Sequence, residues 1–96
     1  MNNMSNELVI RNFLRGLDGQ TPKRDVVNGY YTYKGRTLYT QDNYLINYAT
    51  RIAKLEGNTV YLNIKKYSVT TSKIQSKIRS LANEYSLQLV EVEGEM

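Results

Sequence analysis

The sequence contains no cysteine, no histidine and no tryptophan, and it has a single proline. Without cysteine the chain can form no disulfide, bind no zinc through thiolates and use no thiol nucleophile, which fits a reducing compartment. Without histidine it lacks the commonest transition-metal ligand and the usual general base near neutral pH. We therefore expect no metal site, no cofactor and no catalytic residues, and we predict that the protein is not an enzyme.

Long apolar runs are also missing. Uncharged stretches such as residues 43–50 are short and are interrupted by tyrosine and asparagine, so we expect no segment to span a membrane. The first ten residues do not show the basic, apolar and cleavage regions of a signal peptide in that order. We expect a soluble cytoplasmic protein without a membrane partner, and we expect no small-molecule ligand.

Tyrosine is abundant where other aromatic residues are scarce. The chain has 96 residues, enough for one domain with a single two-layer core, and nine of them are tyrosine against one phenylalanine. A tyrosine hydroxyl usually needs water or a hydrogen-bond partner, so a small core cannot absorb many such side chains. Some of the tyrosines should therefore lie on the surface.

Residues 65–85 predict an amphipathic helix around which the rest of the chain is organised. Apolar side chains recur there at helical spacing, and lysine and arginine occupy the remaining faces. Thr70, Thr71 and Ser72 are natural N-cap residues, so we expect the helix to begin at residue 71 or 72 and to cover residues 72–85. The apolar stripe consists of Ile74, Ile78, Leu81, Ala82 and Tyr85.

The N-terminal quarter predicts a second helix followed by a connector. An imperfect apolar stripe over residues 6–16 favours a helix, with Ser5 or Asn6 as its cap and glycines at its end. Residues 17–25 hold Pro22 among polar residues and are typical of a polar connector. These two segments would precede the sheet.

Residues 26–64 have the pattern of a β-sheet. We expect a hairpin in which residues 30–33 pair with residues 37–40 around a Lys34-Gly35 turn. For residues 44–55 a helix competes with a strand, and we favour a strand over at least residues 48–54. The turn signal at residues 56–58 would then connect it to a partner strand over residues 59–64.

Residues 87–92 alternate and predict a last strand after the main helix. The order predicts an α+β fold, a small antiparallel sheet of four to five strands with two helices packed on one face. We expect a single domain over residues 1–96.

Charge is unevenly distributed. Residues 65–85 carry five Lys or Arg against one Glu, whereas residues 86–96 carry three Glu and no basic residue. The amides and dipole of a helix start favour an anion, so a phosphate site is one interpretation and an ordinary solvated, capped helix is the other. The spacing of a nucleotide-hydrolysing Walker loop is absent. The candidate phosphate-binding residues are Lys65, Lys66, Thr71, Ser72, Lys73 and Arg79.

The tyrosine-rich sheet and the basic helix together predict a protein-binding surface. Because Tyr30 and Tyr31 are adjacent in a predicted strand, they should point to opposite faces, so at least one should lie outside the core. Tyrosine and cationic side chains are favoured in interfaces, although tyrosine is also an ordinary strand former. The candidate partner-binding residues are Tyr30, Tyr31, Tyr67, Lys73 and Lys77.

Four short strings carry a resemblance to a known kind of domain. In order they are Leu38-Tyr39, Arg51-Ile52-Ala53, Val60-Tyr61-Leu62-Asn63 and Lys66-Tyr67-Ser68-Val69-Thr70-Thr71-Ser72-Lys73. The pattern resembles a small domain found in proteins of phages and other mobile elements, and it covers about residues 28–80. The resemblance implies a small accessory protein, such as an anti-CRISPR or other anti-defence protein, that acts by binding alone in the cytoplasm of the host cell.

Two hypotheses of function follow. The first is a stoichiometric binder and inhibitor of a host defence complex, whose partner is a protein complex with or without its bound nucleic acid. The second is a nucleic-acid-binding accessory protein that uses the basic helix on phosphates. A sequence pI near 9.4 disfavours an inhibitor that imitates DNA over its whole surface.

Overall fold

The computed structural model describes residues 5–20, 24–27, 30–33 and 37–96, and for residues 24–27 and 30–33 it describes the strands and their pairing. The elements are α1 (Asn6–Leu14), β1 (Arg24–Val27), β2 (Tyr30–Tyr33), β3 (Leu38–Gln41), β4 (Tyr44–Asn47), β5 (Thr50–Glu56), β6 (Thr59–Asn63), α2 (Val69–Glu84) and β7 (Gln88–Val92).

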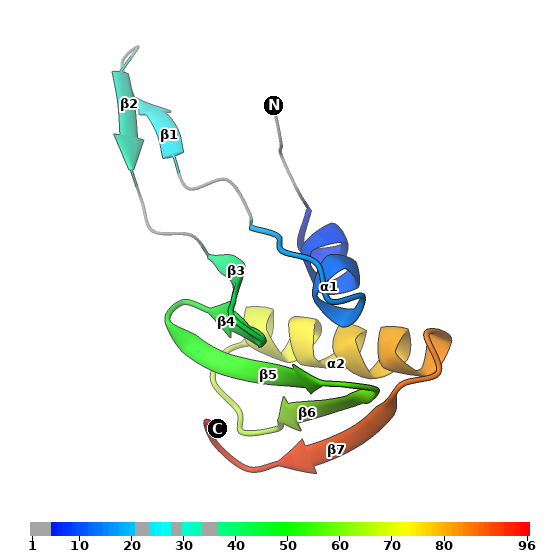
Figure 1. The fold of residues 1–96 in the computed structure, drawn as a ribbon. Coiled ribbons are helices and arrows are strands. Elements are labelled where there is room, and N and C mark those ends of the chain that lie inside the picture. Colours follow the sequence, from blue (N-terminus) through cyan, green and yellow to red (C-terminus); the bar gives the residue numbers. More distant parts are fainter. Residues whose placement is uncertain (1–4, 21–23, 28–29, 34–36) are drawn as a thin grey trace.

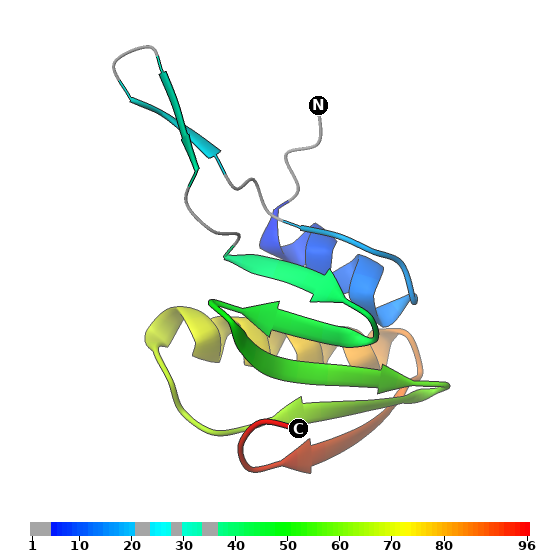
Figure 2. The same ribbon diagram turned by 60° about the vertical axis from the view of Figure 1, so that its left-hand side comes forward.

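A five-stranded sheet with two helices on one face forms the body of the protein (Figures 1 and 2). Its strand order is β3-β4-β5-β6-β7. Helix α1 packs over β3 and β4, and α2 packs over β6 and β7. The predicted α+β class is confirmed, and the sheet is antiparallel except that β6 and β7 run parallel. Their parallel direction arises because α2 carries the chain back across the sheet between them.

Two tight turns connect β3, β4 and β5. Asp42 and Asn43 connect β3 to β4, and Tyr48 and Ala49 connect β4 to β5. Tyr48 and Ala49 have φ angles of 51° and 70°, the left-handed conformation that two-residue hairpin turns require. The strand favoured over residues 48–54 is therefore correct only from Thr50 onward. The tight turn was missed because Tyr and Ala are not the Asn and Gly that normally mark it.

The predicted pairing of residues 30–33 with residues 37–40 is wrong. Strand β2 pairs with β1, with Val27 opposite Tyr30, and β3 pairs with β4, with Leu38 opposite Asn47. Pairing with β4 places β3 in a sheet where the helices can cover Leu38, which is fully buried. The Lys34-Gly35 turn lies outside the described residues.

Strands β1 and β2 form a separate two-stranded sheet that extends away from the main sheet (Figures 1 and 2). The predicted connector over residues 17–25 is therefore wrong at its end, since β1 begins at Arg24. Its earlier part lies along β3, where Gln20 forms an isolated bridge with Tyr39. The polar composition suggested a connector, but it does not exclude strand pairing, because the hydrogen bonds between strands are made by backbone groups.

The helices bury the stripes expected from the sequence. Helix α1 ends at Leu14 rather than at residue 16, and the Ser5 hydroxyl caps its start by accepting from the Leu8 amide at 3.2 Å. Helix α2 buries Ile78 completely, and Tyr85 is partly buried against the core. The core comprises Val9, Ile10, Phe13, Leu14, Leu38, Leu45, Ile52, Ala53, Val60, Leu62, Ile74, Ile78, Leu81 and Ala82. No helix among the described residues has the length and apolar character needed to cross a membrane.

Candidate functional site

The start of α2 differs from the sequence prediction. The helix begins at Val69, and its N-cap is Ser68, whose hydroxyl accepts from the Thr71 amide at 3.1 Å. Thr71 and Ser72 are therefore helical residues, and the predicted cap at residues 70–72 is wrong. Several adjacent hydroxyl residues can cap equally well by type, so a tertiary contact decides which one does.

That tertiary contact is made by Thr71. Its hydroxyl donates to Asn47 Oδ1 at 2.7 Å, and the amide group of Asn47 donates to the Thr37 carbonyl at 2.6 Å. Both Asn47 and Thr71 are buried. Hydrogen bonds between buried groups stabilise the folded state chiefly because a buried donor or acceptor without a partner costs free energy. Thr71, one of the candidate phosphate-binding residues, is thus part of the interior rather than of an anion site.

Asn63 is a second buried polar centre and is fully inaccessible to solvent. Its amide nitrogen donates to the Arg51 carbonyl at 3.2 Å and to the Tyr67 hydroxyl at 2.8 Å. Its side-chain oxygen accepts from the amides of Lys65 at 2.9 Å and Gly94 at 3.0 Å. One side chain therefore fixes the end of β6, the loop that leads into α2, and the segment that follows β7.

Gln75 completes this arrangement from the helix. Its amide nitrogen donates to the carbonyls of Asn63 at 2.7 Å and Lys65 at 3.0 Å. Among the described residues, no buried side-chain nitrogen or oxygen lacks a partner. Sequence reasoning did not identify Asn47, Asn63 or Gln75 as buried, because nothing in the local pattern shows which polar residues a distant strand will cover.

The predicted basic residues do not form one cluster. Lys73 and Lys77 lie on the side of α2 that faces α1, whereas Arg79 pairs with Glu91 of β7 at 2.8 Å. The Lys65 ammonium lies 5.8 Å from the centre of the Tyr67 ring, in the loop before the helix. The other candidate in that loop, Lys66, is exposed. The candidate phosphate-binding residues are therefore spread over a buried position, a loop and two flanks of α2.

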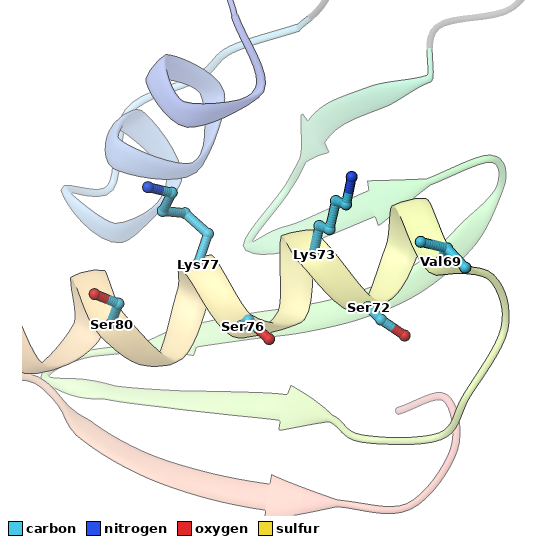
Figure 3. Close-up of a pocket in the computed structure, with 6 residues that line it drawn as sticks. All are labelled: Val69, Ser72, Lys73, Ser76, Lys77 and Ser80. Atoms are coloured by element: carbon cyan, nitrogen blue, oxygen red, sulfur yellow. The ribbon is translucent and has the colours of Figure 1, made fainter.

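The outward side of α2 forms a shallow groove of about 430 Å³ (Figure 3). Figure 3 shows Lys73 and Lys77 extending from the same side of the helix. Lys77 is held by Glu7 of α1 at 3.2 Å. The described lining residues are Val69, Ser72, Lys73, Ser76, Lys77 and Ser80. This groove offers two ammonium groups and small hydroxyls to a partner, but one of those ammonium groups already has a counter-charge.

A charged cluster joins α1 to α2. The Arg11 guanidinium pairs with Glu84 at 2.8 Å and with Glu7 at 3.0 Å, and it also donates to the Tyr85 hydroxyl at 3.0 Å. Hydrogen bonds from Arg11 and then Lys77 lower the pKa of Glu7 below its ordinary value. Hydrogen bonds with Glu84, then Tyr85 and Glu7, raise the pKa of Arg11. Glu7 and Glu84 are exposed and Arg11 is only partly buried, so the cluster orients the two helices more than it stabilises the fold.

The sheet face away from the helices carries aromatic and cationic side chains, and we call it the open face. Because side chains alternate along a strand, residues next to the buried ones point to this face. The registers align Tyr44, Lys54, Tyr61 and Val90 in one row across four strands, and Tyr39, Ile46 and Arg51 in a second row across three. The open face is thus Tyr39, Tyr44, Ile46, Arg51, Lys54, Tyr61 and Val90, of which Ile46 is itself buried.

The cations of the open face are stacked on one tyrosine. The Arg51 guanidinium carbon lies 4.5 Å from the centre of the Tyr44 ring, and the Lys54 ammonium lies 5.7 Å from it. Cations placed over a ring are attracted by its π-electrons and are held in position. Lys54 also pairs with Glu56 at 3.5 Å, while Arg51 is exposed. The open face therefore presents two pre-positioned positive charges between half-buried tyrosines.

Sequence reasoning expected a tyrosine surface but chose other tyrosines for it. Tyr30 and Tyr31 begin β2, and their side chains lie outside the described part of the chain. Tyr67 is 40% exposed and lies over the end of β6, bonded to Asn63. Alternation around Leu45 and Leu62 could have placed Tyr44 and Tyr61 on a common face, if the strand boundaries had been known.

Chemically, these surfaces are suited to binding. Within the described ranges, no group of three or more acidic, histidine or cysteine side chains could hold a metal ion. Comparisons with models of protein families, with curated proteins and with solved structures find no match to this chain. The candidate function is therefore inferred from the residues of this chain and from the geometry of its open face.

Proposed function

We propose that the protein is a stoichiometric binder of a protein partner and that it contacts an acidic surface of that partner through the open face. The observation that carries this proposal is the row of Tyr44, Lys54 and Tyr61, with Arg51 stacked on Tyr44. Tyrosine and arginine are the residues in which interface energy is most often concentrated. A cation that is already held over a ring loses less conformational freedom on binding than a free side chain.

The charge of the chain supports an acidic partner. The formal net charge is +4, and the open face contributes Arg51 and Lys54 to the positive total. Complementary charge speeds association and selects among partners, although it adds less to affinity than the buried aromatic contacts do. A surface of this kind would bind a protein with acidic side chains around an apolar centre.

The resemblance to the phage and mobile-element domain adds a biological context to the proposal. In that context the partner is a component of a host defence complex, with or without nucleic acid bound to it, and binding inhibits the complex. Localisation in the cytoplasm of the host cell is part of the same proposal.

A capture experiment on folded variants tests the surface. Affinity-tagged Tyr61→Ala with Lys54→Glu should lose the partner that the parent retains from host cells, because both changes lie in the aromatic row. Lys73→Glu is the matched control, since it reverses an exposed lysine on α2 instead. Retention by the double variant with loss in Lys73→Glu would place the contact surface along the groove on α2 that Lys73 and Lys77 line.

A nuclease arm tests the alternative function. If the partner is a protein, nuclease treatment of the extract should leave the captured complex intact. Binding to phosphates would instead fall steeply with salt and disappear after nuclease treatment. In that case the protein would be a nucleic-acid-binding accessory protein, as the second hypothesis states.

A further inference from the structure

The segment after β7 turns back towards β5 (Figure 2). We call residues 93–96 the acidic tail. Gly94 has a φ of +100°, a conformation that other residues rarely adopt, and its amide donates to Asn63 Oδ1 at 3.0 Å. The Ile64 amide holds the end of β7 by donating to the Val92 carbonyl at 2.8 Å. The direction of the acidic tail is thus set by a glycine and by the buried side chain of Asn63.

The acidic tail contacts Arg51 of β5. The backbone amide of Arg51 donates to Glu95 Oε1 at 2.7 Å, and its guanidinium donates to the Met96 oxygen at 3.0 Å. Pairing between β5 and β6 extends only to Ala53 opposite Leu62, so Arg51 lies beyond the end of that ladder. The Asn63 side chain bonds the Arg51 carbonyl, and the Glu95 carboxylate bonds its amide. A carboxylate side chain therefore takes the place that a paired strand would otherwise occupy.

From these contacts we infer that the Arg51 end of the open face accepts an extended acidic segment of the partner protein, and that the acidic tail is its intramolecular competitor. Arg51 offers an anion a backbone amide, a guanidinium and, through Tyr44, a fixed orientation. Glu95 already occupies this position as an acidic ligand, since its carboxylate accepts from the Arg51 amide. This inference rests on the proposed function and specifies the partner as an acidic peptide segment.

The contact has the properties of a displaceable one. Glu95 and Arg51 are both exposed, and hydrogen bonds that water can reach contribute little to stability because water competes for the same donors and acceptors. Alanine at position 94 would meet no atom within 4 Å, so its only effect there would be on the backbone conformation. Gly94→Ala should therefore shift the acidic tail away from Arg51 and release the Gly94 amide from Asn63 Oδ1, which keeps the Lys65 amide as a donor.

The test uses the full chain and a fluorescent octaglutamate peptide as the probe. Apparent affinity equals intrinsic affinity multiplied by the fraction of molecules in which the site is free. If the acidic tail occupies Arg51 most of the time, Glu95→Ala and Gly94→Ala should each bind the probe about 3- to 10-fold more tightly than the parent. Gly57→Ala is the control, since it adds a methyl group at another glycine of positive φ (+58°), in the β5–β6 turn and away from the acidic tail. It should bind as the parent does.

Two further variants distinguish the inference from the proposed function. Arg51→Gln and Lys54→Glu should both lose the octaglutamate probe. If they do, but Glu95→Ala and Gly94→Ala bind no more tightly than the parent, the competitor role of the acidic tail is refuted and the open face stands. If Arg51→Gln and Lys54→Glu bind the probe as the parent does, the open face itself is refuted.

The class of ligand is tested with a second probe. A labelled dodecathymidine should bind at least 10-fold more weakly than octaglutamate at physiological salt. Equal or tighter binding that depends on Arg51 would overturn the assignment to an acidic peptide and indicate a nucleic acid. Absence of octaglutamate binding to every variant would also overturn that assignment, while the capture experiment would still decide the open face independently.

Discussion

The two faces of the sheet are built from adjacent residues and differ in almost every physical property. Leu45, Ala53 and Leu62 point to the helices and are fully buried, whereas their neighbours Tyr44, Lys54 and Tyr61 point the other way and remain half-buried. The covered face stabilises the fold by removing apolar surface from water. The open face keeps charges and rings accessible. Folding and recognition are thus separated by one step along each strand, and single substitutions can address them separately.

The largest effect is expected on the covered side. Ile78 of α2 is fully buried. Ile78→Ala should therefore lower the free energy of unfolding by about 2 to 5 kcal/mol through lost burial and a residual cavity. Lys77→Ala, one residue earlier and exposed, should change it by no more than about 0.5 kcal/mol. Denaturant melts measure both values. Equal small losses would contradict the packing of α2 on the sheet.

The next effect is expected in the buried polar contacts beside the covered face. Thr71→Val keeps the side-chain shape but leaves Asn47 Oδ1 without its donor, which should cost about 1 to 3 kcal/mol. Thr70→Val is the matched control, because Thr70 is exposed one residue earlier in the same helix turn. Thermal melts of the two variants should differ clearly. A similar stability would mean that water replaces the lost hydroxyl.

A smaller effect on stability is expected on the open face. Lys54→Ala removes the ion pair with Glu56 and the contact with the Tyr44 ring. The free energy of unfolding should therefore fall by about 0.5 kcal/mol and by at most about 1 kcal/mol. Partner capture should nevertheless weaken in the same variant. Loss of stability comparable to that of Ile78→Ala would show that the open face is part of the core.

The smallest effect concerns pH. Arg11, and after it Lys77, holds the pKa of Glu7 below its ordinary value of 4.5. Because the folded pKa is depressed, the contact stabilises the folded state above pH 4.5 and loses its contribution as the pH falls through the lower folded pKa. An NMR titration of the Glu7 carboxyl should show a higher midpoint in Arg11→Ala than in the parent. Identical midpoints would exclude this ion-pair cluster in solution.

Much of the fold was predictable because its elements have strong local signals. The stripe of Ile74, Ile78 and Leu81 gave α2, and the Gly57 turn gave the β5–β6 hairpin. Where local signals were absent, the prediction failed. Tyr48 and Ala49 form a turn that their residue types do not announce, and the pairing of β2 depends on which of two neighbouring strands can reach it.

The candidate site was less predictable than the fold. Lysines in a helix can be counted from the sequence, but their counter-charges come from other elements, as Glu7 does for Lys77 and Glu91 for Arg79. Likewise, Thr71 has the residue type of an anion ligand and is instead buried against Asn47. Charge pairing and burial are properties of the tertiary structure, so a sequence pattern can indicate only which side chains are candidates for a binding site.

The parallel pairing of β6 with β7 has a consequence for the order of folding. Strands β3 to β6 are joined by short turns, so they can close loops of low entropic cost and assemble early. Strand β7 can join only after α2 has crossed the sheet, which makes its pairing the most non-local one in the main sheet. We therefore expect β7 to dock late on the folding pathway and to exchange its amide protons sooner than β5. Glu95 reaches Arg51 only after that step.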